Sequence, residues 1–336
     1  MKLSEPILEV KHLKTYFFRG DAVMRASDDL SYSVNKGECV AIVGESGSGK
    51  SVNAMSILRL IPYPPGLVMD GEVLFHGQNL LEMSDEEIKQ LRGSKISMIF
   101  QEPSTALNPV MTIGSQISES LMLHRGLKKK EAMKEAVDLL RKVNIPNPEQ
   151  RVKQYPFEFS GGMQQRAMIA MAMSCDPEIL IADEPTTALD VTVQAQVLEE
   201  LNRLREETGM TLIIITHNLG VVARYADSVK VMYGGKIVEE GNTYDIFENP
   251  HHPYTIGLIN AVPRLDLPRS HGLHTIEGEP PDMSQVPPDS CAFAHRCKYA
   301  TEQCWNTRPQ LETLENDHLC ACFHKNETRA EREALV

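Results

Sequence analysis

The sequence lacks long apolar runs. None of its uninterrupted apolar stretches approaches the roughly 18 to 20 residues that a helix needs to cross a bilayer. The first residues, Met1 to Glu5, also lack the apolar core of a secretory signal peptide. We therefore expect a cytoplasmic protein that reaches a membrane only through partner proteins.

Basic charge is scarce relative to acidic charge. The 336 residues include 46 Asp and Glu but only 34 Lys and Arg, which gives a net charge of −12. This balance argues against sequence-independent binding of nucleic acid through a basic face. Hydrophobic residues make up 42% of the chain, which is enough for a packed core, so we expect one large globular domain or two smaller ones.

The seven cysteines include no Cys-x-x-Cys pair, the spacing typical of zinc ribbons and bacterial ferredoxins. Cys39 and Cys175 stand in apolar segments and are expected in the core. The other five are close together near the C-terminus: Cys291, Cys297, Cys304, Cys320 and Cys322. Disulfides are disfavoured in a reduced cytosol, so metal ligation is the better interpretation, but the spacing leaves the metal open.

A glycine-rich loop directly follows the apolar run Cys39 to Val43. Its residues are Gly44, Glu45, Ser46, Gly47, Ser48, Gly49, Lys50 and Ser51. Glycines let backbone N–H groups approach phosphate oxygens, Lys50 neutralises phosphate charge, and the Ser51 hydroxyl can hold Mg²⁺. Apolar residues recur at helical spacing from the loop to Ile61, so a helix N-terminus adds its dipole. An ordinary glycine-rich turn would not require lysine followed by serine, and the loop therefore predicts ATP as the ligand.

Two further segments carry polar groups that suit a nucleotide site. Asp183 and Glu184 follow an apolar strand pattern, which would place two carboxylates at the strand's edge beside the phosphate loop. The alternative is a charge pair at a helix N-terminus. Ser160, followed by Gly161 and Gly162, stands where a helical pattern begins, so its hydroxyl and the next N–H groups can form an anion site.

The order of patterns along the chain predicts an α/β protein. Strand and helix patterns alternate up to residue 265, and a helical subdomain is expected within them at about 102–160. A mainly parallel sheet covered by helices fits this alternation. Prolines then punctuate the sequence and the periodic apolar patterns disappear, so we expect a separate C-terminal extension over 266–336.

These motifs together resemble those of ATP-binding cassette (ABC) proteins, over most of Ile7 to about Asp266. The segment Ser-Gly-Gly-Met-Gln-Gln-Arg at 160–166 carries most of the discrimination. The later His252-Pro253-Tyr254-Thr255 and the spaced cysteines are similar to the tails of ATPase subunits of bacterial dipeptide and oligopeptide importers. The resemblance implies a P-loop ATPase core of ABC type with an antiparallel β-subdomain, an inserted helical subdomain and a small irregular cysteine-bearing extension.

The resemblance implies roles for five residues in hydrolysis. Asp183 would hold Mg²⁺ together with Ser51 and Gln101. Glu184 would be the general base that polarises the attacking water, because a positioned carboxylate can orient the nucleophile of phosphoryl transfer. His217 would contact the γ-phosphate as a switch, and a purely structural histidine is the alternative.

Further residues are implicated in binding ATP and in joining two cassettes. Ser160, Gly161 and Gly162 would face the γ-phosphate held by a second subunit, and Asp190 would help to couple the two sites. An aromatic ring near the N-terminus should stack on adenine. The spacing from Leu13 favours Phe17 over its neighbours Tyr16 and Phe18, and a plain strand role is the alternative for each of the three.

The resemblance implies an ATPase that powers import of dipeptides or oligopeptides. The implied partners are a second ABC subunit, expected to be a paralogue, two membrane permeases and an extracytoplasmic peptide-binding protein, with no nucleic acid. The chain would then lie at the cytoplasmic face of a bacterial membrane. One alternative is that the same kind of ATPase powers import of nickel or another small solute. The alternative from another functional class is a soluble ABC ATPase that takes no part in transport.

The resemblance also favours a four-iron, four-sulfur cluster in the extension. Its ligands would be Cys291, Cys297, Cys304 and Cys322, with Cys320 as the spare thiol. Zinc and free thiols are the alternatives, and a redox-sensing tail is a further one.

Overall fold

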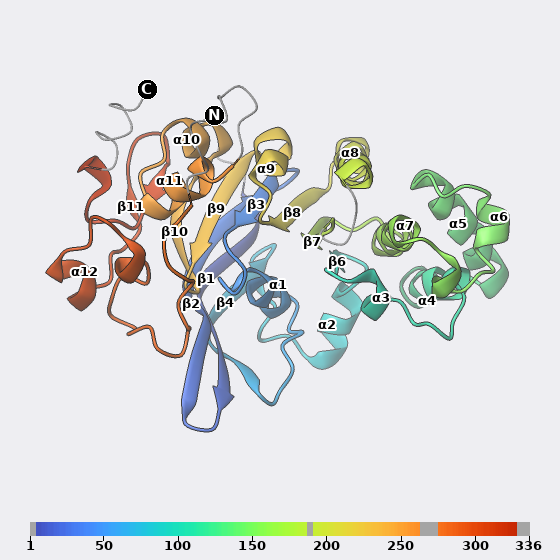
Figure 1. The fold of residues 1–336 in the computed structure, drawn as a ribbon. Coiled ribbons are helices and arrows are strands. Elements are labelled where there is room, and N and C mark those ends of the chain that lie inside the picture. Colours follow the sequence, from blue (N-terminus) through green and yellow to red (C-terminus); the bar gives the residue numbers. More distant parts are fainter. Residues whose placement is uncertain (1–4, 187–190, 263–274, 328–336) are drawn as a thin grey trace. The chain divides into compact units, whose positions relative to one another are not determined.

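The computed structural model describes residues 5–186, 191–262 and 275–327, and it contains two compact units (Figure 1). We call the first the helical unit; it comprises Met1–Glu5, Asn35–Glu38 and Glu82–Ile215. We call the second the sheet unit; it comprises Pro6–Val34, Cys39–Leu81 and Thr216–Val336.

The sheet unit contains an antiparallel sheet formed early in the chain. Its strands have the order β2-β1-β4-β5, and β4 pairs antiparallel with both β1 and β5. The strands are β1 (Pro6–Arg19), β2 (Ala22–Asn35), β4 (Gly66–Phe75) and β5 (Gln78–Asn79). The predicted antiparallel β-subdomain is therefore present.

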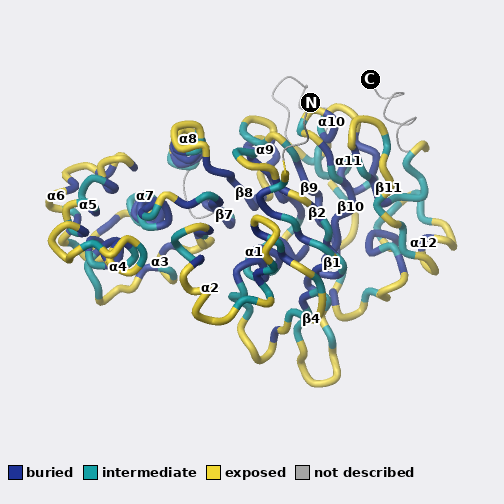
Figure 2. Tube along the Cα trace, turned by 180° about the vertical axis from the view of Figure 1, so that it is seen from behind, coloured by how far each residue is buried: buried dark blue, intermediate teal, exposed yellow. Residues whose placement is uncertain are grey.

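The sheet unit also contains five strands of mixed direction in the order β11-β12-β10-β9-β3. Strand β3 pairs parallel with β9, and the remaining neighbours are antiparallel. These strands are β3 (Cys39–Val43), β9 (Ser228–Tyr233), β10 (Lys236–Asn242), β11 (Glu312–Thr313) and β12 (Leu319–Cys320). Every residue of β3 is buried, as expected for a strand covered on both faces, and the neighbouring β9 is buried along most of its length (Figure 2).

Helices of the sheet unit pack beside these strands. They are α1 (Lys50–Ile57), α9 (Leu219–Tyr225), α10 (Thr243–Glu248), α11 (Pro253–Asn260), the short 3₁₀ helix η3 (Ala294–Arg296) and α12 (Glu302–Asn306). One apolar cluster joins Val43 of β3 and Val231 of β9 to Tyr254 of α11 and Phe293 of the extension. The extension thus shares a core with the strand that leads into the phosphate loop.

The helical unit contains the parallel strands β8-β7-β6 and most of the helices. Its strands are β6 (Ile96–Ile99), β7 (Ile179–Asp183) and β8 (Thr211–Thr216), of which Thr216 belongs to the sheet unit. Its helices are α2 (Asp85–Leu91), α3 (Pro103–Ala106), α4 (Ile113–Arg125), α5 (Lys129–Lys142), α6 (Pro148–Arg151), the 3₁₀ helix η1 (Pro156–Glu158), α7 (Gly161–Ala172) and α8 (Val191–Thr208).

The helical insertion has the predicted character. Residues 102–160, all of which the structure describes, form helices and contain no strand. In the described part of the chain, none of the helices combines the length and the apolar character needed to span a bilayer. The predicted boundary of the extension near residue 266 lies outside the described residues.

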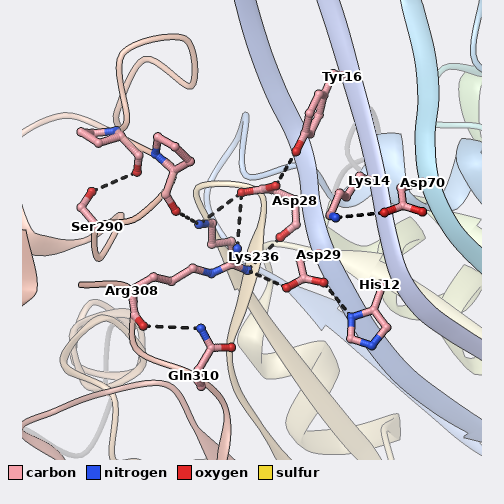
Figure 3. Close-up of polar contacts among 12 residues, drawn as sticks. His12, Lys14, Tyr16, Asp28, Asp29, Asp70, Lys236, Ser290, Arg308 and Gln310 are labelled. Atoms are coloured by element: carbon pink, nitrogen blue, oxygen red, sulfur yellow. Dashed lines mark hydrogen bonds and ion pairs between the residues drawn. The ribbon is translucent and has the colours of Figure 1, made fainter. Parts of the chain in front are cut away.

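Ion pairs attach the extension to the antiparallel sheet (Figure 3). Asp28 of β2 accepts a hydrogen bond from the Tyr16 hydroxyl (2.7 Å) and pairs with Lys236 Nζ (3.2 Å) and Arg308 Nη1 (3.6 Å). Burial raises the pKa of the Asp28 carboxyl, but the Tyr16 hydrogen bond and the two positive charges outweigh burial, so its pKa lies below the ordinary value. Asp28 is therefore held as a carboxylate.

Asp28→Asn should lower the free energy of unfolding by about 3 kcal/mol, because it leaves the buried Lys236 ammonium without its counter-charge. The matched control is Asp29→Asn. Asp29 is 31% exposed, and its ion pairs are with the exposed His12 and, at 3.8 Å, with Arg308, so its loss should cost less than about 1 kcal/mol. Urea denaturation of both variants measures the difference, and equal stabilities would contradict a structural role for the Asp28 cluster.

Candidate ATP site and cysteine cavity

The phosphate loop has a backbone that only glycine permits at two positions. A Cβ atom on Gly44 would lie 2.2 Å from the Met232 carbonyl oxygen, and one on Gly49 would lie 1.9 Å from the Ala26 carbonyl oxygen. Gly49 also has a φ of +100° at the start of α1. Ser46 and Gly47 form the exposed tip of the loop. Close packing against neighbouring strands therefore fixes the loop.

Lys50 points back into the loop that precedes it. Its ammonium donates hydrogen bonds to the carbonyl oxygens of Gly44 and Glu45, both at 2.8 Å, and lies 3.4 Å from Ser48 Oγ. The residue is buried, and Ser51 follows it in the first turn of α1. A positive charge is thus held at the centre of a ring of backbone groups, which suits a phosphate anion.

The helical unit brings two predicted catalytic residues together. Gln101, just after β6, donates from Nε2 to Glu184 Oε2 at 3.0 Å. Glu184 follows the buried Asp183, which ends β7, and its φ of +44° is rare for a residue other than glycine. Its N–H donates to the Ile215 carbonyl oxygen at 2.9 Å. Such strain is often found at functional sites.

Ser160 and His217 lie at the ends of regular elements. Ser160 is the N-cap of α7, and its hydroxyl accepts from the Met163 N–H at 3.4 Å. Gly161 and Gly162 form the first turn, with a Cβ on Gly162 only 2.9 Å from Val193 of α8. His217 is exposed and directly follows β8. Thr187 to Asp190 lie outside the described residues, so the role of Asp190 stays a prediction.

The N-terminal aromatic residues differ in their surroundings. Tyr16 donates its hydroxyl to Asp28, whereas Phe17 lies opposite Gly66 in the neighbouring strand. A Cβ on Gly66 would approach the Phe17 ring to 2.8 Å, so this glycine makes room for the ring. Phe18 is exposed. Stacking of Phe17 on adenine stays a prediction.

Comparisons with known proteins decide the family. A model described as "ABC transporter" matches residues 27–187, and one described as "Oligopeptide/dipeptide transporter, C-terminal region" matches 238–304. The oligopeptide transport ATP-binding protein AppD of Bacillus subtilis is 47% identical, covering 97% of this chain and 99% of AppD. The chain belongs to the ABC transporter family. It is 48% identical to the dipeptide transport ATP-binding protein DppD of the same organism, with 98% of each chain covered.

A solved structure supports the same conclusion. The dimeric, post-hydrolysis ATP-binding cassette MJ0796 bound to ADP and Pi superposes with a TM-score of 0.64. It is 28% identical and covers 70% of this chain and 98% of that cassette. The predicted fold class is thereby confirmed. As a member of this family, the chain binds ATP with Mg²⁺ and hydrolyses it.

Four cysteines of the extension line one cavity together with His252, Phe293 and His324: Cys291, Cys297, Cys304 and Cys322. Cys320 is fully buried in β12 and does not line it. Burial, together with a smaller effect of neighbouring cysteines, raises the pKa of the Cys291 and Cys297 thiols to about 11 and that of Cys322 to about 12. The thiols of Cys291, Cys297 and Cys322 are therefore protonated unless a cation displaces their protons.

The cysteine cavity has suitable donors, yet its side chains are not arranged as ligands. Within residues 5–186, 191–262 and 275–327, no three His, Cys, Asp or Glu side chains are gathered closely enough to hold a metal ion. Four thiols around one cavity fit a metal or cluster by chemistry. Their spacing in this structure does not show one.

His252 links the cysteine cavity to α11. It is the N-cap of that helix, and its Nδ1 accepts from the Tyr254 N–H at 3.1 Å. Burial lowers the pKa of His252 to about 4, although the charge of Glu239 opposes the shift. The buried imidazole is therefore neutral at physiological pH.

Acid should destabilise the protein through His252. A histidine with an ordinary pKa near 6.5 in the unfolded chain and about 4 in the folded one stabilises the fold fully above pH 6.5. That contribution, about 3 kcal/mol, is lost as pH falls from 6.5 to 4. His252→Asn keeps an N-cap acceptor without this titration. Urea denaturation at pH 7.5 and 4.5 should show a smaller loss in the variant, whereas the exposed His12→Asn should behave as the wild type.

Two residues that contact the phosphate loop were not predicted. Tyr254 accepts a hydrogen bond from the Glu45 N–H at 2.7 Å, and Arg296 pairs with the Glu45 carboxylate. Tyr254 belongs to the tail motif that the sequence singled out. Arg296 directly precedes Cys297, but it is 251 positions from Glu45, and no local spacing connects the two.

Proposed function

We propose that the chain is the ATP-hydrolysing subunit that powers import of dipeptides or oligopeptides. The observation that carries this proposal is the joining of a cassette to an oligopeptide/dipeptide transporter region in one chain. Relatives named for oligopeptide and dipeptide transport support it over nearly their full length. The proposal includes a division of the chain into a nucleotide-binding domain over 1–265 and an extension over 266–336.

Within this proposal, different residues of the chain have different roles in ATP hydrolysis. Phosphate-loop N–H groups and Lys50 bind the phosphates. Ser51, Asp183 and Gln101 would hold Mg²⁺, which would supply positive charge to stabilise the transferring phosphoryl group. Glu184 orients the attacking water, and its contact with Gln101 supports that role. His217 contacts the γ-phosphate.

Two cassettes would act together beneath a membrane. Ser160, Gly161 and Gly162, at an exposed helix N-terminus, would complete the ATP site of a second ABC subunit, and Asp190 would couple the two sites. The helical insertion over 102–160 would contact two permeases. Closure of the cassettes would then be passed to the permeases, whose transport pathway would open alternately to the two sides of the membrane. A peptide-binding protein outside the membrane would deliver substrate. The chain would then be peripheral at the cytoplasmic face.

Reconstitution tests the function. The complex would be purified from membranes and combined with its binding protein, and ATP hydrolysis and uptake would be measured with dipeptides, longer peptides and Ni²⁺. We expect peptides to stimulate both. Stimulation by Ni²⁺ alone would favour the nickel importer, and failure to recover any permease would favour a soluble ABC ATPase.

We further propose an iron–sulfur cluster in the cysteine cavity, held by Cys291, Cys297, Cys304 and Cys322. The four thiols share one cavity and their chemistry suits iron, which supports the proposal. Iron and acid-labile sulfide should both be found after anaerobic purification. Cys297→Ser should lose both, whereas Cys320→Ser should keep them, because Cys320 does not line the cavity. Zinc in place of iron and sulfide, or no metal at all, would contradict the cluster.

A further inference from the structure

The extension reaches the phosphate loop through one arginine. Arg296 Nη1 lies 2.6 Å from Glu45 Oε2, and Nη2 lies 3.2 Å from Oε1, so the guanidinium holds the carboxylate with two hydrogen bonds. The Arg296 side chain is 2% exposed, whereas that of Glu45 is 26% exposed. Arg296 and Glu45 therefore form a bidentate ion pair that is largely shielded from water.

Every remaining donor of this guanidinium is directed at an acceptor. Nε donates to the Glu277 carbonyl oxygen (2.9 Å), Nη2 to that of Ile276 (3.3 Å) and Nη1 to the Tyr233 hydroxyl (3.4 Å). Tyr233 and Phe293 also flank the guanidinium within 6 Å. Lysine could not reproduce this planar fork. These contacts therefore hold the Arg296 side chain in place independently of its pairing with Glu45.

The carboxylate charge of Glu45 would repel the oxygens of a phosphate bound in the loop. Its carbonyl oxygen accepts from Lys50 Nζ, and its N–H donates to Tyr254, so its backbone belongs to the ring that surrounds the lysine. Pairing with Arg296 neutralises the Glu45 carboxylate and holds it toward the guanidinium. Its repulsion of a phosphate bound in the loop is thereby reduced. Tyr254 contacts Tyr233 and Phe293, so the two anchors of Glu45 share one aromatic cluster.

We propose that Arg296 is a positioning residue for the phosphate loop, which makes ATP affinity depend on the C-terminal extension. The inference deepens the proposed function and rests on the ATP site assigned there. Arg296 belongs to the short segment 291–297, whose ends are two cysteines of the cavity and whose turns are closed by hydrogen bonds from Ala294 to Cys291 and from Cys297 to Ala294. The clamp and the cavity therefore share one stretch of backbone.

The test measures binding of Mg²⁺ATP to the purified full-length chain by calorimetry, together with the kcat and KM of hydrolysis. Arg296→Gln should weaken ATP binding by about tenfold and raise KM similarly with little change in kcat, because the loss is in ground-state binding. The ATP affinity of Arg296→Lys should lie between those of the wild type and Arg296→Gln. Lys298→Gln, which removes the same charge from the exposed position directly after this segment, should bind ATP as the wild type does.

A rescue separates positioning from simple loss of structure. Combining Glu45→Gln with Arg296→Gln removes the unpaired carboxylate, so the double variant should recover most of the lost affinity. Unchanged affinity in Arg296→Gln would overturn the proposal, and so would a double variant that binds no better than the single one. These measurements do not depend on stimulation by peptides. A failure of the proposed import function can therefore be told apart from a failure of the proposed role of Arg296.

Discussion

Glu184→Gln should bind ATP but hydrolyse it about 10²- to 10⁴-fold more slowly, the range expected when a general base is removed. The amide is nearly isosteric with the carboxylate, so the hydrogen bond to the Ile215 carbonyl oxygen, made by the backbone, is unaffected. The contact of Gln101 with Oε2 depends on an acceptor, which glutamine also offers. The change therefore isolates the ability to accept a proton from water.

The matched control lies at the other end of the same strand. Glu178 immediately precedes β7 and pairs with Lys95 at the surface (2.9 Å), so Glu178→Gln removes the same charge from the same element. Its hydrolysis rate should stay within about twofold of wild type, as expected for an exposed pair. Single-turnover hydrolysis and ATP-binding titrations on both variants give the comparison. Near-normal turnover in Glu184→Gln would remove Glu184 as the base.

Local signals explain why the ATP motifs could be located from the sequence. Ser84 with Glu87 forms a capping box at the start of α2, and Ser160 caps α7, because an N-cap depends only on residues within one turn. The phosphate loop follows a buried strand and starts a helix, as its glycines and Lys50 predict. Such features require no knowledge of the rest of the chain.

Helix α1 shows where a local signal fails. The apolar spacing predicted a helix up to Ile61, but α1 ends at Ile57. Arg59 takes a left-handed φ of +51°, and Leu60 and Arg59 donate to the carbonyl oxygens of Met55 and Ser56. This is a Schellman ending, which usually has glycine where Arg59 stands. Because glycine is absent at this position, no local signal marks where the helix ends.

Contacts between distant segments could not be predicted at all. The four cysteines named through the resemblance line one cavity, yet in the described part of the chain no three His, Cys, Asp or Glu side chains are gathered closely enough to hold a metal ion. The pairing of Arg296 with Glu45 depends on how the extension packs on β9 and α11, and that packing arises from apolar residues spread over the whole sheet unit. Long-range packing therefore decides the part of the site that local motifs leave open.

Gly49→Ala should abolish ATP binding and destabilise the protein by more than about 4 kcal/mol, an exceptional effect for one substitution that requires a specific structural cause. The new Cβ would lie 1.9 Å from the Ala26 carbonyl oxygen and 3.4 Å from Gly235 Cα, and neither is a flexible side-chain end. The φ of +100° adds strain for any residue with a Cβ. The loop would have to leave β2 and the β9–β10 turn, and Lys50 would move with it.

Gly47→Ala is the control within the same loop. Gly47 has a φ of +79°, but a Cβ there meets no atom within 4 Å, so the cost should be only the left-handed backbone strain of about 1 kcal/mol. Urea denaturation and ATP titration of the two variants separate steric contact from backbone preference. If Gly49→Ala proved as mild as Gly47→Ala, close packing of the loop against Ala26 could not be what fixes its shape.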